Sequence, residues 1–462
     1  MFIGKPSALA VAAVAICVAG SASARVTQAE VDRLDKDLTC VGAEKAGNKD
    51  GTIPEFSGKW LGTPPGIQYT PNVGQHPVDP YPGDKPLYVI TPQNVSQYAD
   101  RLSDGQKAMF ARYPTFRMAI YPGRRDFRYP DFVCAAAKKN AASAESTDGG
   151  MGIKGAVIGS SPFPIPQNGE ELLWNHALPW RAATEKTVRD FANVLPDGTV
   201  SWGRATNHNL SAVTDPKDAG KPLETHNGVM AWAMHLTMLP ERDKGNISIS
   251  QEPVSFAKDK RLAWQYNPGT RRVRQLPEFG FDQPLGGSGG KMTIDQDRLF
   301  NGSPERYTWT MLGKREMYVP ANGYRANAKG VKYADLMTKN HANPDYIRYE
   351  LRRVWVLDGT LKKGFRHLYG KRVLFIDEDN WHAVMSDYYD ARGQLWQWAF
   401  INYYYAYDMQ AWHAGTSFYH DLNSGGYTGY NMFQERDKGP ILNDFKLKPE
   451  MFTPEAARSI GT

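Results

Sequence analysis

The chain has 462 residues, a formal net charge of +6 at pH 7, a mean hydropathy of −0.54 and 12% aromatic residues. This length is enough to bury a large hydrophobic core. The positive charge is a mild excess with no block of five or more like charges, so the composition gives no support to nucleic-acid binding.

The start of the chain has the pattern of a secretory signal peptide. A single charge at Lys5 precedes an apolar run from Ala8 to Val18, and Ala22-Ser23-Ala24 offers an A-x-A cleavage site. An uncleaved membrane anchor is the alternative, but the run is shorter than the ~20 residues that a membrane-spanning helix needs. The sequence therefore predicts that residues 1–24 are removed and that the mature chain is a soluble protein of a bacterial-type periplasm.

Two cysteines remain after this cleavage, Cys40 and Cys134. An even pair in an oxidising compartment favours a disulfide over free thiols. The bridge would tie the N-terminal segment to the segment that follows Tyr129-Pro130. Two buried thiols are the alternative, because the sequence cannot show that the two Cα atoms lie close enough.

Residues 25–196 are expected to form a coil-and-helix extension. Residues 25–40 carry apolar side chains at near-helical spacing, which predicts a short amphipathic helix. Two further short helices are predicted within residues 91–111 and one over residues 168–178, where capping residues precede apolar ones. Within this extension, residues 41–90 are rich in Gly, Pro and Tyr, which is typical of an ordered coil.

From about residue 197 to residue 435 the apolar pattern changes to a period of two, which is typical of strands. Short turns such as Asn267-Pro268-Gly269 separate the segments, so the strands should pair antiparallel. Strands do not alternate with helices, which argues against a parallel α/β sheet. The residues therefore predict an α+β, mainly antiparallel β protein. The expected strands include Val200–Trp202, Met230–Met234, Leu262–Tyr266, Tyr307–Met311, Arg352–Asp358, Arg372–Ile376, Ala383–Tyr389 and Gln394–Tyr405.

Several patterns that could carry chemistry have a simpler structural explanation. Gly286–Gly290 matches G-x-S-x-G, but its four glycines and the strand-like residues that follow indicate a flexible loop rather than a nucleophile elbow. Asp377–Asp379 could supply paired carboxylates, but adjacent residues on a tight turn normally point into water. His382, His413 and His420 could meet in space, yet the histidines have no metal-binding spacing. We predict neither a metal site nor a cofactor.

One hairpin has the composition of a ligand-binding element. Trp264 and Tyr266 lie on an aromatic strand, and Arg271, Arg272 and Arg274 follow the turn. Aromatic faces can cover an apolar ligand while arginine forks hold a carboxylate or phosphate head. The alternative is a sheet whose arginines form ion pairs with their neighbours, and spacing alone favours that explanation.

Four ordered motifs over residues 30–435 resemble those of the secreted DUF1329 family, a domain of unknown function. The first contains Val41-Gly42-Ala43-Glu44-Lys45-Ala46-Gly47-Asn48 and Asp50-Gly51-Thr52-Ile53-Pro54. The second contains Pro162-Phe163-Pro164-Ile165-Pro166-Gln167-Asn168-Gly169 with Trp174-Asn175-His176. The third contains Phe300-Asn301-Gly302, Pro304-Glu305-Arg306-Tyr307 and Gly313-Lys314. The fourth contains Arg353-Val354-Trp355, Arg366-His367, Tyr369-Gly370-Lys371-Arg372 and Ile376-Asp377-Glu378-Asp379. Cys40 departs from the family pattern, in which a proline is expected.

This resemblance implies a fold similar to that of the outer-membrane lipoprotein-sorting proteins LolA and LolB. Residues 25–462 would then form a single domain, a large curved sheet that makes an incomplete, half-open β-barrel. Helices at residues 91–111 and 168–178 would cover the concave face, whose wall would be apolar and aromatic. The expected ligand-contacting residues are Trp264, Tyr266, Arg271, Arg272, Arg274, Tyr307, Trp309, Trp355, Phe163 and Trp174.

The resemblance also implies a function without a catalytic motif. It predicts a periplasmic carrier for a hydrophobic small molecule, either a lipid, a sterol or a lipoprotein acyl group. Such a carrier could work with an RND-type exporter of the inner membrane and an outer-membrane protein. A secreted hydrolase with a polar cleft around His382, Asp387 and His413 is one alternative. A structural scaffold of an envelope complex is another, and fold transfers between relatives better than activity does.

Overall fold

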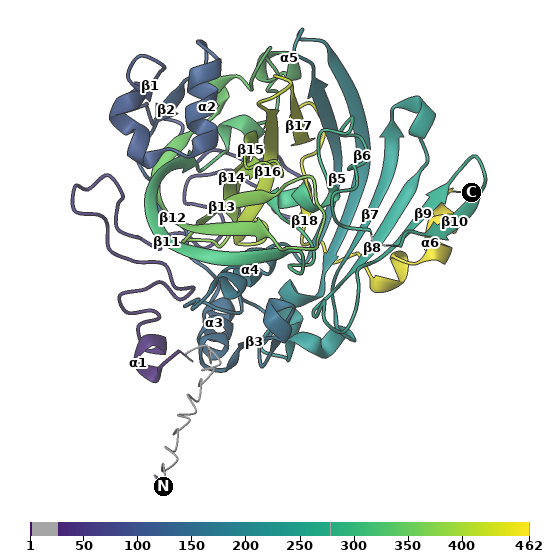
Figure 1. Ribbon diagram of the computed structural model, residues 1–462, viewed down its shortest axis with the longest axis horizontal. Coiled ribbons are helices and arrows are strands. Elements are labelled where there is room, and N and C mark those ends of the chain that lie inside the picture. The colour runs from purple at the N-terminus through teal and green to yellow at the C-terminus, as the bar shows by residue number, and fades with distance from the viewer. Residues whose placement is uncertain (2–25, 278, 462) are drawn as a thin grey trace.

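The computed structural model describes residue 1, residues 26–277 and residues 279–461 (Figure 1). The predicted signal peptide therefore lies outside the described residues apart from Met1. No helix in the described part of the chain is long and apolar enough to cross a membrane.

A single large sheet dominates the fold, and its longest strands form two antiparallel runs (Figure 1). Strand β17 pairs with β5 and joins the two runs, while β10 and β11 lie at opposite edges and leave the sheet open. The first run comprises β5 (Thr184–Val194), β6 (Val200–Ser211), β7 (Val229–Leu239), β8 (Ile247–Pro253), β9 (Leu262–Asn267) and β10 (Arg272–Gln275). The second comprises β11 (Tyr307–Pro320), β12 (Tyr349–Leu361), β13 (Lys371–Asp377), β14 (Ala383–Tyr389), β15 (Leu395–Ala406), β16 (Ala411–Asp421) and β17 (Tyr427–Met432).

Short strands extend this architecture. The hairpin β1–β2 joins β12 through the one parallel contact among the described strands, and β18 pairs with β5. A separate hairpin is formed by β3 and β4. These strands are β1 (Tyr88–Ile90), β2 (Met118–Ile120), β3 (Glu145–Thr147), β4 (Gly152–Lys154) and β18 (Ile441–Leu442).

The predicted fold class, mainly antiparallel β with an open curved sheet, is confirmed. Each expected strand lies within a strand of the structure except that Gln394 precedes β15, and Ala383–Tyr389 is reproduced as β14. The sheet begins earlier than expected, because β5 starts at Thr184, upstream of residue 197. Strand β5 contains many polar residues, so its sequence lacks the apolar–polar alternation by which the other strands were predicted.

The helices are short and begin at the expected kind of cap. Ser103 and Gln106 form a capping box at the start of α2, and Asn168 accepts a 2.9 Å hydrogen bond from the main-chain N–H of Glu171 at the start of α4. The helix predicted over residues 25–40 is limited to one turn, α1. The described α-helices are α1 (Gln28–Val31), α2 (Asp104–Arg112), α3 (Asp131–Ser143), α4 (Gly169–Ala177), α5 (Tyr333–Leu336) and α6 (Pro454–Gly461).

Residues 276–306, here called the crossover, connect the two opposite edges and must therefore traverse the sheet. The face that the crossover covers is here called the inner face. The hydroxyl of Tyr388 donates to the carbonyl of Leu299 at 2.7 Å, so Tyr388 points to the inner face. Its neighbour Asp387 points to the outer face, where it accepts a 3.0 Å hydrogen bond from Ser103 beside α2.

The two helical segments expected to cover one face therefore lie on different faces. Helix α4 lies on the inner side, where His176 hydrogen-bonds the carbonyl of Phe300 in the crossover at 3.0 Å. Helix α2 packs against β14 and β15 on the outer face. This corrects the expectation that residues 91–111 cover the same face as residues 168–178.

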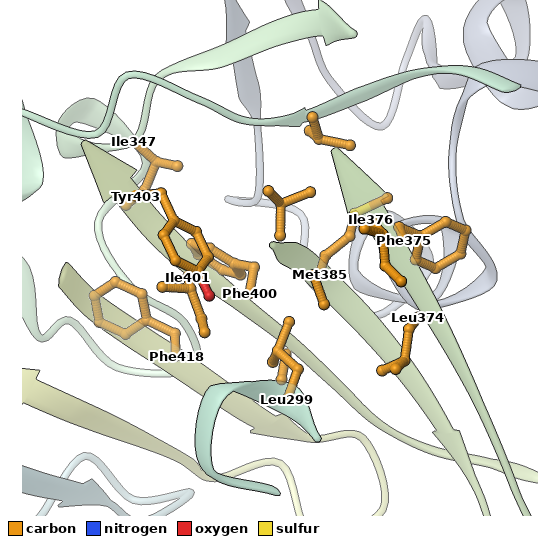
Figure 2. Packing of buried hydrophobic residues seen from close by; sticks show 14 of the residues in the cluster. Leu299, Ile347, Leu374, Phe375, Ile376, Met385, Phe400, Ile401, Tyr403 and Phe418 are labelled. Atoms are coloured by element: carbon orange, nitrogen blue, oxygen red, sulfur yellow. The ribbon is translucent and has the colours of Figure 1, made fainter. Parts of the chain in front are cut away.

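The main hydrophobic core lies against the second run of strands. Figure 2 shows Leu299 of the crossover among apolar side chains of β13, β14, β15 and β16. Leu299 and Leu374, which pairs with Ser386 on the same face as Tyr388, are fully buried there. The chain thus fills this half of the inner face with its own side chains, and the apolar open trough expected along the strands is absent from it.

The predicted disulfide is confirmed. Cys40 and Cys134 are bonded, and their Cα atoms lie 5.0 Å apart. The bridge joins the N-terminal coil to α3, as the sequence predicted.

Candidate ligand-binding cavity

A cavity lies between the inner face of the first run of strands and the crossover. It has two adjoining compartments of about 360 Å³ and about 160 Å³. Both compartments are lined by Arg189 and Tyr430 from the sheet and by Asp297 from the crossover, so they are contiguous. The larger volume is within the usual range for small-molecule sites.

The cavity is polar on the sheet side because polar residues occupy alternate positions of the strands. Asn207 and Asn209 of β6, His235 of β7 and Ser250 of β8 line it. The alternate outward positions carry large apolar side chains that form a separate cluster with the C-terminal segment. That cluster includes Leu210, Trp232, Met234, Ile247, Ile249, Tyr266, Leu447, Phe452 and Ala457. The C-terminal segment therefore buries the apolar face and leaves the polar one facing the cavity.

Arg189 is the most deeply buried arginine of the cavity wall. Its guanidinium carbon lies 4.8 Å from the centre of the Tyr430 ring and 5.8 Å from the centre of the Phe191 ring, and these two rings stack on each other. Its Nη2 lies 3.2 Å from His235 Nε2 and its Nη1 donates weakly to Asn431 at 3.4 Å. Its Nε is buried without a partner. Within the described chain no carboxylate lies within 4.0 Å of Arg189.

Two more arginines enter the smaller compartment. Arg181 and Arg298 both line it and also line a void of about 30 Å³ beneath Trp174. Neither forms an ion pair within the described residues, and one nitrogen of Arg298 is buried without a partner. Burial, together with the nearby charge of Arg298, lowers the pKa of Arg181 to about 9, so Arg181 is still cationic at pH 7.

The carboxylates of the cavity are fewer than its arginines. Glu252 forms an ion pair with Arg261, and Arg204 of the larger compartment is paired with Asp190 at 2.6 Å. Glu185 accepts a 3.2 Å hydrogen bond from Asn209. Asp297 lines both compartments, and among the described residues neither Asp297 nor Glu185 forms an ion pair with an arginine or lysine.

The cavity histidines are neutral at pH 7. Burial lowers the pKa values of His235, His382 and His413 below the usual range, and for His235 the charge of Arg189 adds to this effect. His382 stacks on Tyr403 with ring centres 4.5 Å apart, and both of its ring nitrogens are buried without a partner.

The larger compartment has an apolar side. Phe191 and Leu239 of the sheet face it together with apolar residues of the crossover. The crossover contributes Leu276, Phe279, Pro284, Leu285 and Ile294. The cavity as a whole is thus amphipathic, and its smaller end is lined by Arg181, Arg189 and Arg298, which form no ion pair among the described residues.

The hairpin residues predicted to bind ligand do not line the cavity. Trp264 and Tyr266 pack on the outer face, where the hydroxyl of Tyr266 donates to the carbonyl of Gly461 at 2.9 Å. Arg271, Arg272 and Arg274 are exposed at the sheet edge. The apolar face of this hairpin is the outward one, which contradicts the expected aromatic concave wall.

The other predicted ligand residues are mostly core residues. The hydroxyl of Tyr307 donates to the carbonyl of Tyr369 at 2.8 Å, and Trp309 packs against Phe300 with ring centres 4.8 Å apart. Trp355 stacks on Trp381, and Phe163 is buried in a satellite cluster with Trp174. Of the predicted set, Trp174 lines the void of about 30 Å³ together with Arg181 and Arg298. Contact with a ligand stays a prediction for all of these residues, and the cavity supports it only near Trp174.

The carboxylates of the β13–β14 turn are buried, not solvated. Asp377, Glu378 and Asp379 are each 2% exposed. Arg125 holds Asp379 with two hydrogen bonds of 2.8 and 2.9 Å, and Arg352 adds a third at 2.8 Å. Burial acting alone would raise the pKa of Asp379, but these two arginines hold it below its usual value. The expectation of a solvated turn is therefore wrong, and the turn anchors the N-terminal coil.

The geometry gives little support to the two catalytic hypotheses, the cleft around His382, Asp387 and His413 and the nucleophile elbow at Ser288. His382 and His413 do line the smaller compartment, but Asp387 lies on the opposite face. The hydroxyl of Ser288 donates to the carbonyl of Leu285 at 2.7 Å, and the segment continues into a β-bridge at Thr293. Its surroundings thus lack the strand-to-helix turn of a nucleophile elbow.

Together, the fold and the cavity define an open-sheet, antiparallel β protein with an internal amphipathic cavity. The chain belongs to the family described as protein of unknown function (DUF1329), whose model matches residues 89–458. The predicted resemblance to that family is thereby confirmed. A curated relative, Uncharacterized protein PA3922 of Pseudomonas aeruginosa, is 38% identical over 440 residues, which cover 95% of this chain and 94% of that protein.

Three solved structures are more distantly similar. A putative outer membrane lipoprotein-sorting protein domain from Vibrio parahaemolyticus aligns with a TM-score of 0.41 and 15% identity, over 60% of this chain and 92% of its own. A DUF1329 family protein from Desulfovibrio piger aligns with a TM-score of 0.40 and 13% identity over the same shares of the two chains. A LolA superfamily protein, NE2245, from Nitrosomonas europaea has a TM-score of 0.38 and 13% identity over 63% of this chain and 99% of its own.

Proposed function

We propose that this protein is a non-enzymatic carrier that holds an amphipathic small molecule in the cavity between the first run of strands and the crossover. The observation that carries the proposal is the cavity itself, in which an apolar wall and a polar, arginine-bearing end are contiguous. A lipid or another acyl compound has this distribution of apolar and polar groups.

The apolar wall supplies the driving force for binding. Burial of apolar surface contributes about 25 cal/mol per Å², so an alkyl chain lying along Phe191 and Leu285 would offset much of the entropy lost on binding. The polar end would fix the orientation of the ligand, because its buried arginines need partners. A site with these two properties supports a carrier better than a scaffold, which needs an exposed surface instead.

A hydrolase of a lipid or glycan is the second candidate. It would use His382 or His413 as a base, and both face the smaller compartment. Among the described lining residues, however, no serine, threonine or cysteine is hydrogen-bonded to either histidine, as an activated nucleophile would be. We therefore favour the carrier.

The periplasm is the proposed location, and transfer between an inner-membrane exporter and an outer-membrane protein is the proposed setting. The location depends on the signal-peptide pattern of residues 1–24, and the transfer setting is what the resemblance to the LolA and LolB proteins implies. Fractionation of cells that produce the full chain would test the location.

The experiment for the carrier function compares a cavity-filling variant with a matched control. Ala233 lines both compartments, so Ala233→Trp should fill the cavity, whereas Ala391→Trp changes an exposed turn. Mass spectrometry of organic extracts should find a stoichiometric ligand in the wild-type protein and in the control, and none in Ala233→Trp. An empty wild-type protein that also fails to take up Nile red, a neutral apolar dye, would refute the proposal.

A further inference from the structure

We infer that the smaller compartment is a receptor for one singly charged oxyanion, the head of the ligand, held by Arg181, Arg189 and Arg298. This inference rests on the proposed carrier function and deepens it by naming the chemical class of the ligand. A carboxylate and a phosphodiester share the required chemistry.

Arg189 has the environment of an anion receptor. The residue is only 6% exposed, its Nε has no partner, and the groups around its guanidinium are a histidine, an amide and two aromatic rings. A buried guanidinium without a carboxylate is expensive in free energy unless a ligand supplies the charge. A planar guanidinium also matches a carboxylate or phosphate with paired hydrogen bonds.

The charge balance of the smaller compartment sets the charge of the ligand. Its lining contains Arg181, Arg189 and Arg298, and once Glu252 is set aside with its partner Arg261, two carboxylates, those of Glu185 and Asp297, remain. The histidines are neutral, so one positive charge is left in excess. A ligand with one negative charge would neutralise the compartment, whereas a neutral or cationic ligand would leave the excess uncompensated.

The position of the three arginines gives the ligand its orientation. All three line the smaller compartment, while the apolar residues of the crossover line the larger one. An acyl chain would therefore extend under the crossover, with its head beside Arg189. The exposed arginines of β10 have no such enclosure and are the natural controls.

The test uses ligands that share one chain and differ in the head. Displacement of Nile red from the purified protein would be measured with laurate, with lauroyl lysophosphatidylglycerol and with 1-dodecanol, below their micelle concentrations. One or both anions should bind at least about tenfold more tightly than the alcohol, as hydrogen bonds to charged groups predict. The difference between the two anions would tell a free acid from a lipid headgroup.

Variants assign the preference to residues. Arg189→Met keeps the length and apolar stem of the side chain, and Arg298→Gln keeps a polar one; each should reduce anion binding about tenfold while dodecanol binding is unchanged. Arg272→Met should bind as wild type does. If one variant unfolds, as circular dichroism would show, the other still provides the test.

The outcomes separate this inference from the function on which it rests. Equal binding of the anions and the alcohol, or an anion preference that survives both variants, would overturn the anion receptor and leave the carrier intact. Failure of every compound, Nile red included, to bind would refute the carrier and the receptor together.

Discussion

Replacing Asp379 by asparagine should strongly destabilise the protein, because the charge of this residue is buried and held by two arginines. Asp379 is 2% exposed, and its oxygens accept three hydrogen bonds from Arg125 and Arg352 at 2.8 to 2.9 Å. Removing one partner of a buried ion pair costs ~3–5 kcal/mol. Asp377 and Glu378 remain beside the two arginines, so we expect the lower end, about 3 kcal/mol.

The assay is equilibrium unfolding in guanidinium chloride at pH 7, followed by tryptophan fluorescence, with the free energy of unfolding read from the transition. The control is Asp259→Asn, which removes the same charge from an exposed loop residue. Asp379→Asn should unfold at a clearly lower denaturant concentration than the control. Coincident transitions for the two variants would refute the buried network and restore the solvated turn that the sequence suggests.

Three further predictions concern other parts of the fold. Burial raises the pKa of Asp387 to about 7. Between about pH 4 and pH 7 the folded protein therefore holds a proton that the unfolded chain has released. The free energy of unfolding should fall by up to ~4 kcal/mol as the pH rises through this window. Asp387→Asn should remove that fall, and thermal unfolding at pH 5 and pH 8 would reveal it. The Cys40→Ser and Cys134→Ser double variant loses a bridge between two residues with a sequence separation of 94, and its free energy of unfolding in denaturant should be lower by ~4 kcal/mol. An unchanged unfolding midpoint would show that the bridge does not form. Trp264→Glu should destabilise the protein by ~2 kcal/mol or more, because it puts a charge against the apolar cluster that the C-terminal segment covers. Nile red binding should persist while the protein is folded. Loss of dye binding with full stability would favour the placement of the site at this hairpin.

The strands were predictable because their signals are local. A period of two and explicit turns, such as Asn267-Pro268-Gly269, were enough to place the β9–β10 hairpin and β14. Strand β5 escaped because Arg189 and its polar neighbours occupy the positions where a half-buried strand usually carries apolar side chains. The sequence thus predicted where a strand lies in the chain better than it predicted which face of that strand is buried.

The face of the Trp264–Tyr266 strand was predicted wrongly because the usual rule for choosing the inner face fails here. Trp264 and Tyr266 are on the more apolar side of their hairpin, which normally faces the core. In this protein residues from the C-terminal segment, including Phe452 and Ala457, cover that side and form a second hydrophobic layer outside the sheet. A long-range contact of this kind leaves no periodic signal. The contact of Arg125 with Asp379 is likewise long-range and leaves no signal in the sequence, although it helps to bury the β13–β14 turn that the sequence predicted to be solvated.

The cavity itself is a consequence of topology. Strands β10 and β11 are consecutive in the chain but lie at opposite edges of the sheet, so the crossover has to pass over the inner face. Its second half is fixed there by Asp295, which accepts hydrogen bonds from Arg372 at 2.9 Å and from His367 at 3.0 Å. Its first half contributes the apolar wall of the larger compartment. The polar strands alone would be an exposed surface, and the crossover alone would be a loop. Only the packing of the crossover over these strands encloses arginines that form no ion pair among the described residues. The proposed binding site therefore depends on contacts between residues that are distant in the sequence, and not on a motif.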